Sequence, residues 1–338
     1  MEYRRLGRSG LKVSALCLGA MMFGDRTDQA EAGRIVASAR EAGVNFVDTA
    51  DAYAKGESER MLGRLIGADR ERWVVATKVG NTGAPAPNDA DLSRRHVMQA
   101  IDASLGRLGM DHVDLYYLHL EDAGTPLEET VATMGDLVRA GKIRYWGVSN
   151  FHAWRIAETA LLADRMGIPR PAVCQPYYNA VNRMPEVEVL PACEHFGLGV
   201  VPYSPLARGV LTGKYEPGKP PPKDTRAGRG DTRMMQTEFR KESLVAAQKV
   251  AAYAAKRDTT PIAYALNWVL NNALVTSVIA GPRTLAHWQG YVEALRYSFT
   301  ARDEAFLDKL VAPGHPSSPG YTDPRYPVRG RPTRIAAG

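Results

Sequence analysis

Cysteine and long apolar runs are both scarce in this chain of 338 residues. Its three cysteines, Cys17, Cys174 and Cys193, lie far apart, which argues against a disulfide framework or a zinc knuckle. No apolar run approaches the length of a membrane span, and the first ten residues, MEYRRLGRSG, lack the apolar core of a signal peptide. We therefore expect a cytoplasmic protein with no membrane partner.

Acidic residues are fewer than basic ones, so the net charge is +6 and the pI is about 9.1. The excess of arginine and lysine is partly local, in a Gly/Pro-rich stretch at 226–241 and in the tail at 325–334. No basic helix interleaved with aromatic residues is present, so we expect no nucleic-acid partner. A site for a phosphorylated cofactor accounts for the same charge.

Strand and helix patterns alternate along the chain. Two short strands around a Gly/Ser turn are expected in 3–14, and eight buried strands follow at 15–19, 44–47, 73–77, 113–118, 143–147, 172–174, 199–201 and 277–280. Helical patterns separate these strands, and two more helices follow the last one, at 284–294 and 301–310. Eight such units predict an α/β fold of the (β/α)₈ barrel type. An open doubly wound sheet is the alternative, although no G-x-G-x-x-G follows the first strand.

We expect residues 1–338 to form a single barrel domain. Its additions are an N-terminal hairpin at 1–14, a lid-like loop at 207–240, and a C-terminal loop or tail at 312–338. A further polar loop spans 80–91. Because loops on a rigid scaffold carry specificity, we expect these segments to select the substrate.

Polar residues come directly after four successive strands. They are Asp48, Lys78, His119 and the pair Ser149-Asn150, and Tyr53 follows in the loop after the second strand. In a barrel of parallel strands, the C-terminal ends of the strands meet at one rim, where active sites lie. The pattern therefore predicts that these side chains converge.

The residue types suit proton transfer. Asp48 is expected to pair with Lys78, whose ammonium would lie beside the phenol of Tyr53. A free tyrosine has a pKa of about 10, and a nearby ammonium is expected to lower it. Such a phenol can deliver a proton to an oxygen that gains negative charge, as when a carbonyl is reduced. His119 is expected to hydrogen-bond and orient the same oxygen.

Each of these residues alone has an ordinary structural interpretation, as a cap, a packing group, a surface charge or a core histidine. Their joint placement is what indicates a site. A metal site is the main rival. One histidine with scattered carboxylates is a poor ligand set, and the seven histidines of the chain show no H-x-H or H-x-x-x-H spacing near the rim, so we expect no metal.

Seven segments, taken in order, carry a family resemblance. They are GVNFVDTADAY, VVATKVG, VDLYYLHLED, GKIRYWGVSNF, CQPYYN, VPYSPLARGVLTGKY and IAGPRT. Through them the chain resembles the aldo-keto reductase superfamily over nearly its whole length. Within the superfamily it is most similar to the bacterial branch that also resembles potassium-channel β subunits.

The resemblance implies a catalytic tetrad of Asp48, Tyr53, Lys78 and His119, with Tyr53 as the acid, and NADPH bound extended across the rim. The cofactor residues that it implies are Gly19, Met21, Asp48, Ser149, Asn150, Gln175, Tyr203, Ser204, Pro205, Leu206, Gly209, Leu211, Lys214, Gly281, Arg283 and His287. In this assignment Tyr203 stacks on the nicotinamide, whose amide is held by Ser149, Asn150 and Gln175. Arg283 binds the 2′-phosphate.

The chain departs from the family pattern at two places. Met21 stands where a threonine is common, and His287 and Tyr291 occupy the last two polar positions of the usual adenine-binding pattern. The preference for NADPH over NADH therefore rests mainly on Arg283. The basic loop at 226–233 suits either a solvated lid, which we favour, or a clamp over the cofactor pyrophosphate.

The expected function is NADPH-dependent reduction of an aldehyde or ketone, with a small carbonyl compound as partner, by a monomer or homo-oligomer. The alternative from another class is an NADPH-binding interaction module like the channel β subunits. A third possibility is a barrel hydrolase that uses a metal.

Overall fold

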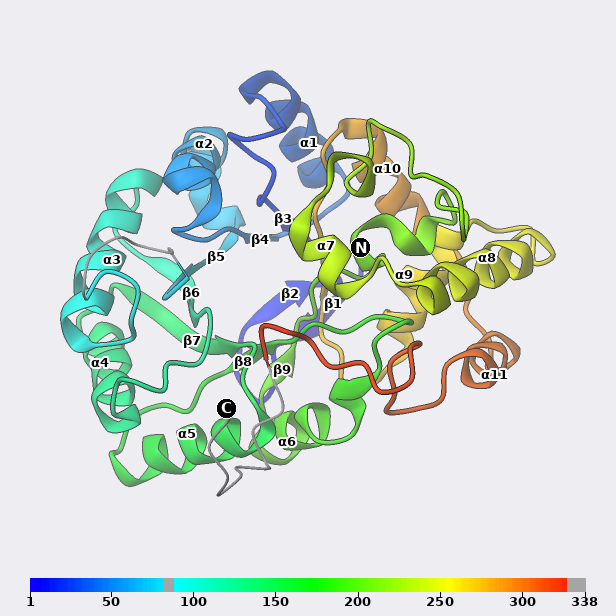
Figure 1. Cartoon of the computed structure of the whole chain (residues 1–338). Coiled ribbons are helices and arrows are strands. Elements are labelled where there is room, and N and C mark those ends of the chain that lie inside the picture. Colours follow the sequence, from blue (N-terminus) through cyan, green and yellow to red (C-terminus); the bar gives the residue numbers. More distant parts are fainter. Residues whose placement is uncertain (82–87, 327–338) are drawn as a thin grey trace, which may run out of the picture.

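Eight parallel strands form the centre of the protein, and helices surround them (Figure 1). The computed structural model describes residues 1–81 and 88–326, so 82–87 of the predicted polar loop and 327–338 of the predicted tail lie outside the described residues. The strands of the central sheet are β3 (Leu16–Gly19), β4 (Phe46–Asp48), β5 (Val74–Val79), β6 (Val113–Leu118), β7 (Ile143–Ser149), β8 (Val173–Gln175), β9 (Gly199–Val200) and β10 (Val278–Ala280).

The helices alternate with these strands, as the sequence predicts. They are α1 (Gln29–Glu41), α2 (Glu57–Ile66), α3 (Arg94–Leu108), α4 (Leu127–Arg139), α5 (Ala153–Arg165), α6 (Val189–Phe196), α7 (Thr232–Thr237), α8 (Lys241–Ala255), α9 (Pro261–Asn271), α10 (Leu285–Ala294) and α11 (Ala301–Leu310). Several of these helices are capped by side chains. At α3, for example, the Ser93 side chain accepts a hydrogen bond from the His96 N–H, and Gly109 takes a left-handed conformation after the last turn.

The sheet closes on itself. Its ladder runs β10-β3-β4-β5-β6-β7-β8-β9, with every neighbouring pair parallel. The two outer strands are joined by backbone hydrogen bonds, from the Thr276 N–H to the Val200 carbonyl at 2.8 Å and from the Ile279 N–H to the Pro202 carbonyl at 3.0 Å. The predicted (β/α)₈ barrel is confirmed, and the doubly wound open sheet is wrong for this chain.

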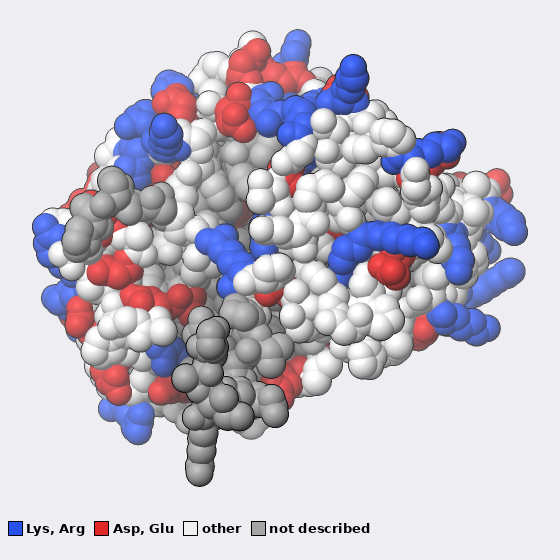
Figure 2. Space-filling model, viewed as in Figure 1, with Lys and Arg blue, Asp and Glu red and all other residues white. Residues whose placement is uncertain are grey.

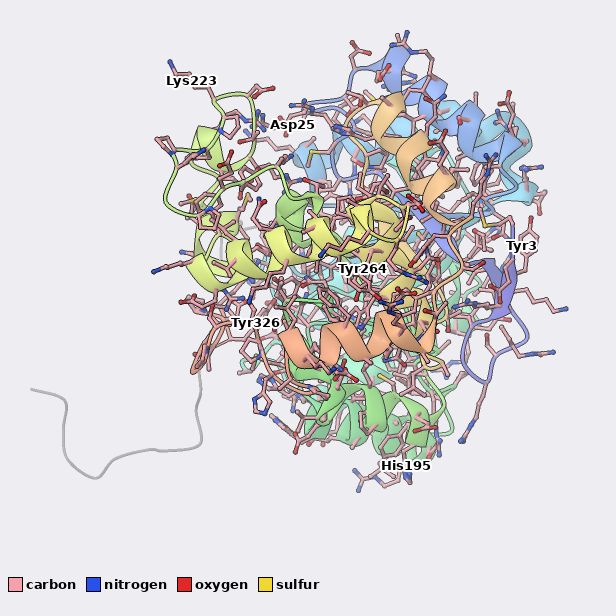
Figure 3. All side chains as sticks on the ribbon, turned by 90° about the vertical axis from the view of Figure 1, so that its right-hand side faces the viewer. Tyr3, Asp25, His195, Lys223, Tyr264 and Tyr326 are labelled. Carbon is pink, nitrogen blue, oxygen red and sulfur yellow. The ribbon has the colours of Figure 1, made fainter. Side chains whose placement is uncertain are left out.

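An N-terminal hairpin, β1 (Tyr3–Arg5) and β2 (Lys12–Ser14), covers one end of the barrel. Its Leu6 and Val13 are fully buried in one cluster with interior residues of the strands, among them Phe46, Leu115 and Tyr117. Figure 3 shows the hairpin residue Tyr3 on one side of the molecule, and Lys223 and Tyr326 on the other. Because apolar side chains fill the hairpin end, only the opposite, C-terminal end of the strands is available for a site.

The segment at 207–240, predicted as a lid-like loop, contains short helical pieces. Two 3₁₀ turns, at Ala207–Thr212 and Ala227–Arg229, precede α7. The Asp231 side chain caps α7 by accepting a hydrogen bond from the Met234 N–H, and Met234 is buried. One buried apolar residue in a six-residue helix leaves no periodic pattern, which is why the sequence did not indicate α7.

The described part of the C-terminal tail is attached to the barrel. The Ser317 N–H donates to the Val181 carbonyl at 3.0 Å, and the guanidinium of Arg240 stacks on the ring of Tyr321 at 3.6 Å. Both terminal nitrogens of Arg233, a residue of α7, donate hydrogen bonds to the carboxylate of Asp323. The tail thereby lies beside the 207–240 segment at the same end of the barrel (Figure 1).

One close helix contact generates a stability prediction. Helix α2 crosses the end of α3 at Gly63, where an added Cβ would lie 2.1 Å from the backbone oxygen of Leu108. We expect Gly63→Ala to lower the free energy of unfolding by roughly 1–3 kcal/mol, because the two helices must separate. Gly106→Ala, in α3 with nothing within 4 Å, is the matched control and should raise stability by about 0.5–1 kcal/mol. The midpoints of urea unfolding of the two variants, each relative to wild type, measure the difference. Equal shifts for Gly63→Ala and Gly106→Ala would contradict the role of the helix contact.

Candidate active site

A buried ammonium group lies at the C-terminal rim of the barrel. Lys78, in β5, is fully buried and donates to three oxygens: Asp48 Oδ1 at 2.5 Å, the Thr49 carbonyl at 2.7 Å, and the Tyr53 hydroxyl at 3.3 Å. Asp48 is the last residue of β4, the neighbouring strand. The structure thus brings three residues of the predicted tetrad into one hydrogen-bonded chain, Asp48–Lys78–Tyr53.

The fourth residue, His119, follows β6 directly and lies against the phenol. Its ring is edge-on to that of Tyr53, with centroids 5.9 Å apart. Its backbone N–H donates to the Val79 carbonyl at 2.9 Å, which fixes it beside the end of β5. The sequence-based expectation that these four residues converge therefore agrees with the geometry.

Polar residues at or just after the ends of β7, β8 and β9 extend this network. Gln175 Nε2 donates to Asp48 Oδ2 at 2.9 Å, and Ser149 Oγ donates to the Gln175 carbonyl at 2.9 Å. Asn150 Nδ2 donates to the His119 carbonyl at 3.0 Å, and the Tyr203 hydroxyl donates to Asn150 Oδ1 at 2.8 Å. These side chains are therefore held in place before any ligand contacts them.

A cavity of about 520 Å³ opens above this network, and Figure 2 shows the corresponding face hollowed near its middle, with Lys and Arg side chains at the edge. Seventeen of the predicted site residues line it: Gly19, Met21, Asp48, Tyr53, His119, Ser149, Asn150, Gln175, Tyr203, Ser204, Pro205, Leu206, Gly209, Lys214, Gly281, Arg283 and His287. Two do not. Lys78 lies beneath the floor, and the side chain of Leu211 is fully buried in the apolar core.

Several lining residues were not singled out as site residues from the sequence. They include Met22, Arg26, Asn81, Leu120, Arg208, Arg325 and Tyr326. Arg226, Arg229 and Arg233 of the basic loop noted in the sequence also line the cavity. The basic loop therefore faces the cavity, and its role as a lid or as a clamp stays a prediction. Arg325 and Tyr326 come from the tail, and no local sequence pattern indicated that they reach the rim.

Backbone strain concentrates around the cavity. Among the described residues, eight other than glycine have positive φ, and six of these lie next to the site: Ala54, Lys55, Asn150, Ser204, Ala207 and Arg208. Such conformations cost roughly 1–3 kcal/mol each and cluster at functional sites. Their positions after Tyr53 and along the loop after β9 provide an independent indication of a site.

Burial and mutual contact shift the pKa values of Asp48 and Lys78 in opposite directions. Burial favours the neutral form of each group, and their contact favours the charged form. Burial raises the pKa of Asp48, and the hydrogen bonds from Lys78 and Gln175 offset this only in part. Burial by itself lowers the pKa of Lys78, but Asp48 and Tyr53 more than compensate, so that this pKa lies above its ordinary value. Lys78 is therefore charged at neutral pH.

The phenol of Tyr53 behaves differently from the sequence-based expectation. Burial raises its pKa, and the lowering by Lys78 is smaller, so the net shift is upward. The expected downward shift is therefore wrong as a net effect, because burial of the ring at the cavity floor outweighs the ammonium. At neutral pH Tyr53 retains its proton and is in the form of an acid that can donate.

Burial lowers the pKa of the His119 imidazole well below its usual value, and the charges of Lys78 and Arg325 lower it further. His119 is therefore neutral at physiological pH. Its Nδ1 is buried with no hydrogen-bond partner within residues 1–81 and 88–326. A neutral imidazole can donate one hydrogen bond to a ligand oxygen without supplying a charge.

Positive charge gathers at the other end of the cavity. Burial lowers the pKa of Lys214, and the nearby charges of Arg283, Arg226 and Arg229 contribute to this shift, which Asp224 opposes. Arg283 precedes α10, whose N-terminus is capped by the side chain of Thr284. Cations and a helix N-terminus together suit a phosphorylated ligand.

Neither a metal site nor a membrane span is found in the part of the chain that the structure describes. Within it, no three His, Cys, Asp or Glu side chains are grouped closely enough to bind a metal ion. None of its helices has the length and apolarity needed to cross a bilayer.

Comparison with known proteins identifies the family. The family model described as "Aldo/keto reductase family" matches residues 15–312. The chain belongs to the aldo/keto reductase family. The resemblance noted in the sequence is thereby confirmed, as is the prediction of an oxidoreductase of this family.

Similar aldo/keto reductase relatives carry different names. A probable voltage-gated potassium channel subunit beta of Arabidopsis thaliana is 40% identical over 286 residues, covering 83% of this chain and 87% of the relative. The uncharacterized oxidoreductase YrpG of Bacillus subtilis is 35% identical over 336 residues, covering 95% and 99%. An L-glyceraldehyde 3-phosphate reductase of Escherichia coli is 32% identical over 329 residues, covering 93% of both.

A further buried acid lies behind the tetrad. Asp51 is 8% exposed, and its Oδ1 has no hydrogen-bond partner among the described residues. Burial, with a contribution from the neighbouring carboxylate of Glu59, raises the pKa of Asp51 to about 7. Because the folded state holds this proton more tightly than the unfolded chain does, ionisation of Asp51 destabilises the fold.

This shift predicts a pH-dependent stability difference. A raised folded-state pKa means that wild-type stability falls as the pH rises from the unfolded value of about 4 through about 7. We expect the unfolding free energy of Asp51→Asn, relative to wild type, to rise by roughly 2–3 kcal/mol from about pH 5 to pH 8. Urea unfolding at several pH values measures it. Asp111→Asn, at an exposed position, is the control, and the same pH trend in both variants would exclude Asp51 as its source.

Proposed function

We propose that the protein reduces an aldehyde or ketone to the alcohol with NADPH, and that Tyr53 supplies the proton. The observation that carries this proposal is the buried chain Asp48–Lys78–Tyr53 at the floor of the cavity, with Lys78 Nζ 3.3 Å from the phenol. The family membership and the relative named L-glyceraldehyde 3-phosphate reductase support the same reaction class.

The donor set of the cavity fits NADPH. Four cations, Lys214, Arg226, Arg229 and Arg283, face one end of it, which matches the charge of a pyrophosphate and a 2′-phosphate. At the other end, Ser149, Asn150 and Gln175 offer polar groups for a carboxamide, and Tyr203 offers a ring for stacking. When bound, NADPH supplies the hydride that a carbonyl reduction requires.

The residues of the floor deliver and stabilise the proton. Tyr53 is protonated at neutral pH and donates to the carbonyl oxygen as negative charge develops there. The ammonium of Lys78 then stabilises the phenolate that remains, since opposite charges attract strongly in a buried site. Asp48 acts through Lys78: it keeps the ammonium charged and, with the Thr49 carbonyl, holds it below the phenol.

His119 orients the carbonyl. Its neutral ring lies edge-on to Tyr53, so one substrate oxygen can accept hydrogen bonds from both side chains. A neutral histidine is a weaker acid than an imidazolium, which leaves Tyr53 as the proton donor. The low pKa of His119 thereby separates the two roles.

A second candidate function is an NADPH-binding module whose contact with a partner protein matters more than turnover. The 40% identity to a probable potassium channel subunit beta favours it. The complete tetrad favours catalysis. Oxidation of NADPH with a panel of carbonyl compounds separates the two, since tight cofactor binding without any turnover would support the module.

The catalytic role of Tyr53 gives the central test. We expect Tyr53→Phe to reduce kcat/KM for carbonyl reduction by about 10²–10⁴-fold, because the variant lacks the acid. NADPH binding, measured by quenching of protein fluorescence, should be retained. Tyr116→Phe, which removes a buried hydroxyl with no hydrogen-bond partner among the described residues, is the matched control and should keep its activity. Substantial turnover by Tyr53→Phe would identify another proton donor.

The cofactor preference gives a second test. If Arg283 binds the 2′-phosphate, Arg283→Gln should weaken NADPH binding roughly ten- to a hundredfold through the loss of a charge-assisted hydrogen bond. NADH, which has no 2′-phosphate, should bind almost as before. Arg296→Gln, just beyond α10 and exposed, serves as the control. Equal losses for both cofactors would assign Arg283 to a different group.

A further inference from the structure

The last part of the described chain reaches the cavity. We define this C-terminal strap as residues 321–326. Tyr321 stacks on Arg240, and Asp323 forms a two-pronged ion pair with Arg233 of α7, with one N–O distance of 2.6 Å. Tyr326 is half-buried and lines the cavity. The strap is therefore attached at several points on the side of the molecule that carries the rim, where Figure 3 labels Tyr326.

The strap places one guanidinium next to the tetrad. Arg325 lines the same cavity as His119 and donates through Nη2 to Asn81 Oδ1. Asn81 lies two residues after Val79, and the Val79 carbonyl accepts the His119 backbone N–H at 2.9 Å. The lowering of the His119 pKa by Arg325 agrees with this proximity. Arg325 thus lies at the substrate end of the cavity, beside the group proposed to orient the carbonyl.

The other cations of the cavity are already accounted for. Lys214, Arg226, Arg229 and Arg283 lie at the end assigned to the cofactor phosphates. Arg208 is paired with the buried carboxylate of Glu238 at 2.9 Å.

Arg233 is paired with Asp323, and Arg26 lies 3.6 Å from Asp25. Among the cavity cations within residues 1–81 and 88–326, Arg325 is the one with neither a carboxylate partner nor a place among the cofactor phosphates. Asn81 takes up one of its donors and supplies no compensating charge.

We propose that Arg325 binds an anionic group of the substrate, so that this reductase acts on aldehydes or ketones that carry a carboxylate or a phosphate. The inference rests on the function proposed above and narrows its substrate class. A guanidinium has a planar fork of donors that matches either anion. Its position at the mouth leaves it hydrated in the free protein, and a substrate entering the cavity would cover it and strengthen the contact.

The test compares pairs of carbonyl compounds in which one member carries an anionic group and the other a neutral group in its place. One pair is 4-formylbenzoate and its methyl ester, and a second is glyceraldehyde 3-phosphate and glyceraldehyde. The two pairs distinguish a carboxylate from a phosphate. We expect wild type to prefer the anionic member of at least one pair. Arg325→Gln should reduce the anionic-to-neutral ratio of kcat/KM roughly ten- to a hundredfold, the usual effect of losing a charge-assisted hydrogen bond.

Two further variants keep the result interpretable. Asn81→Asp retains Arg325 and its hydrogen-bond acceptor but places a carboxylate against the guanidinium, so the same ratio should fall without removal of the strap contact. Arg144→Gln removes an exposed arginine at the start of β7, at the opposite end of the strand from the rim, and should leave the ratio unchanged.

The outcomes separate this inference from the function on which it rests. Equal ratios in wild type, Arg325→Gln and Asn81→Asp, or a wild-type preference for the neutral members, would overturn the role of Arg325 while leaving the reductase intact. Failure of every carbonyl compound, charged or neutral, to oxidise NADPH would overturn the proposed function and this inference with it.

Discussion

The charge of Lys78 is the constraint on which the rim of the barrel depends. An ammonium with no exposure to water is costly unless each of its donors finds an acceptor. Here its three N–H groups meet the Asp48 carboxylate, the Thr49 carbonyl and the Tyr53 hydroxyl. The hydrogen bonds that Lys78 donates therefore hold in place the end of β4, the turn after it and the phenol of Tyr53. The same hydrogen bonds stabilise the buried ammonium and serve the proposed proton transfer.

The strand register carries this constraint around the barrel. Gly19 is paired with Asp48 across β3 and β4, and Ser149 is paired with Gln175 across β7 and β8. Gln175 then reaches across the interior to Asp48. A side chain added at Gly19 would lie 2.7 Å from the side chain of Ile279, so the residue at this place on the rim is small for steric reasons. The hydrogen bond from Gln175 to Asp48 thus connects β8 with β4 across the interior of the barrel.

Local patterns in the sequence were sufficient for the barrel and for the tetrad. Short buried strands that alternate with helices carry their signal in consecutive residues, and Asp48, Lys78 and His119 were found because each lies at a strand end. The net pKa shift of Tyr53 could not be predicted, because burial results from the packing of the whole rim. Arg325 was missed for a similar reason. It meets Asn81 across 244 positions of sequence, and nothing near either residue indicates the contact.

Closure of the barrel also has a consequence for biosynthesis. The first strand of the ring, β3, has β10 as one of its two neighbours, and β10 lies roughly 260 residues further along the chain. At the usual elongation rates of about 5–20 residues per second, one edge of β3 therefore waits roughly 13–50 s for its partner to be synthesised. An apolar strand edge left open for that time is a template for pairing with other chains. The nascent protein must therefore keep that edge from pairing elsewhere at least until residue 280 has been synthesised.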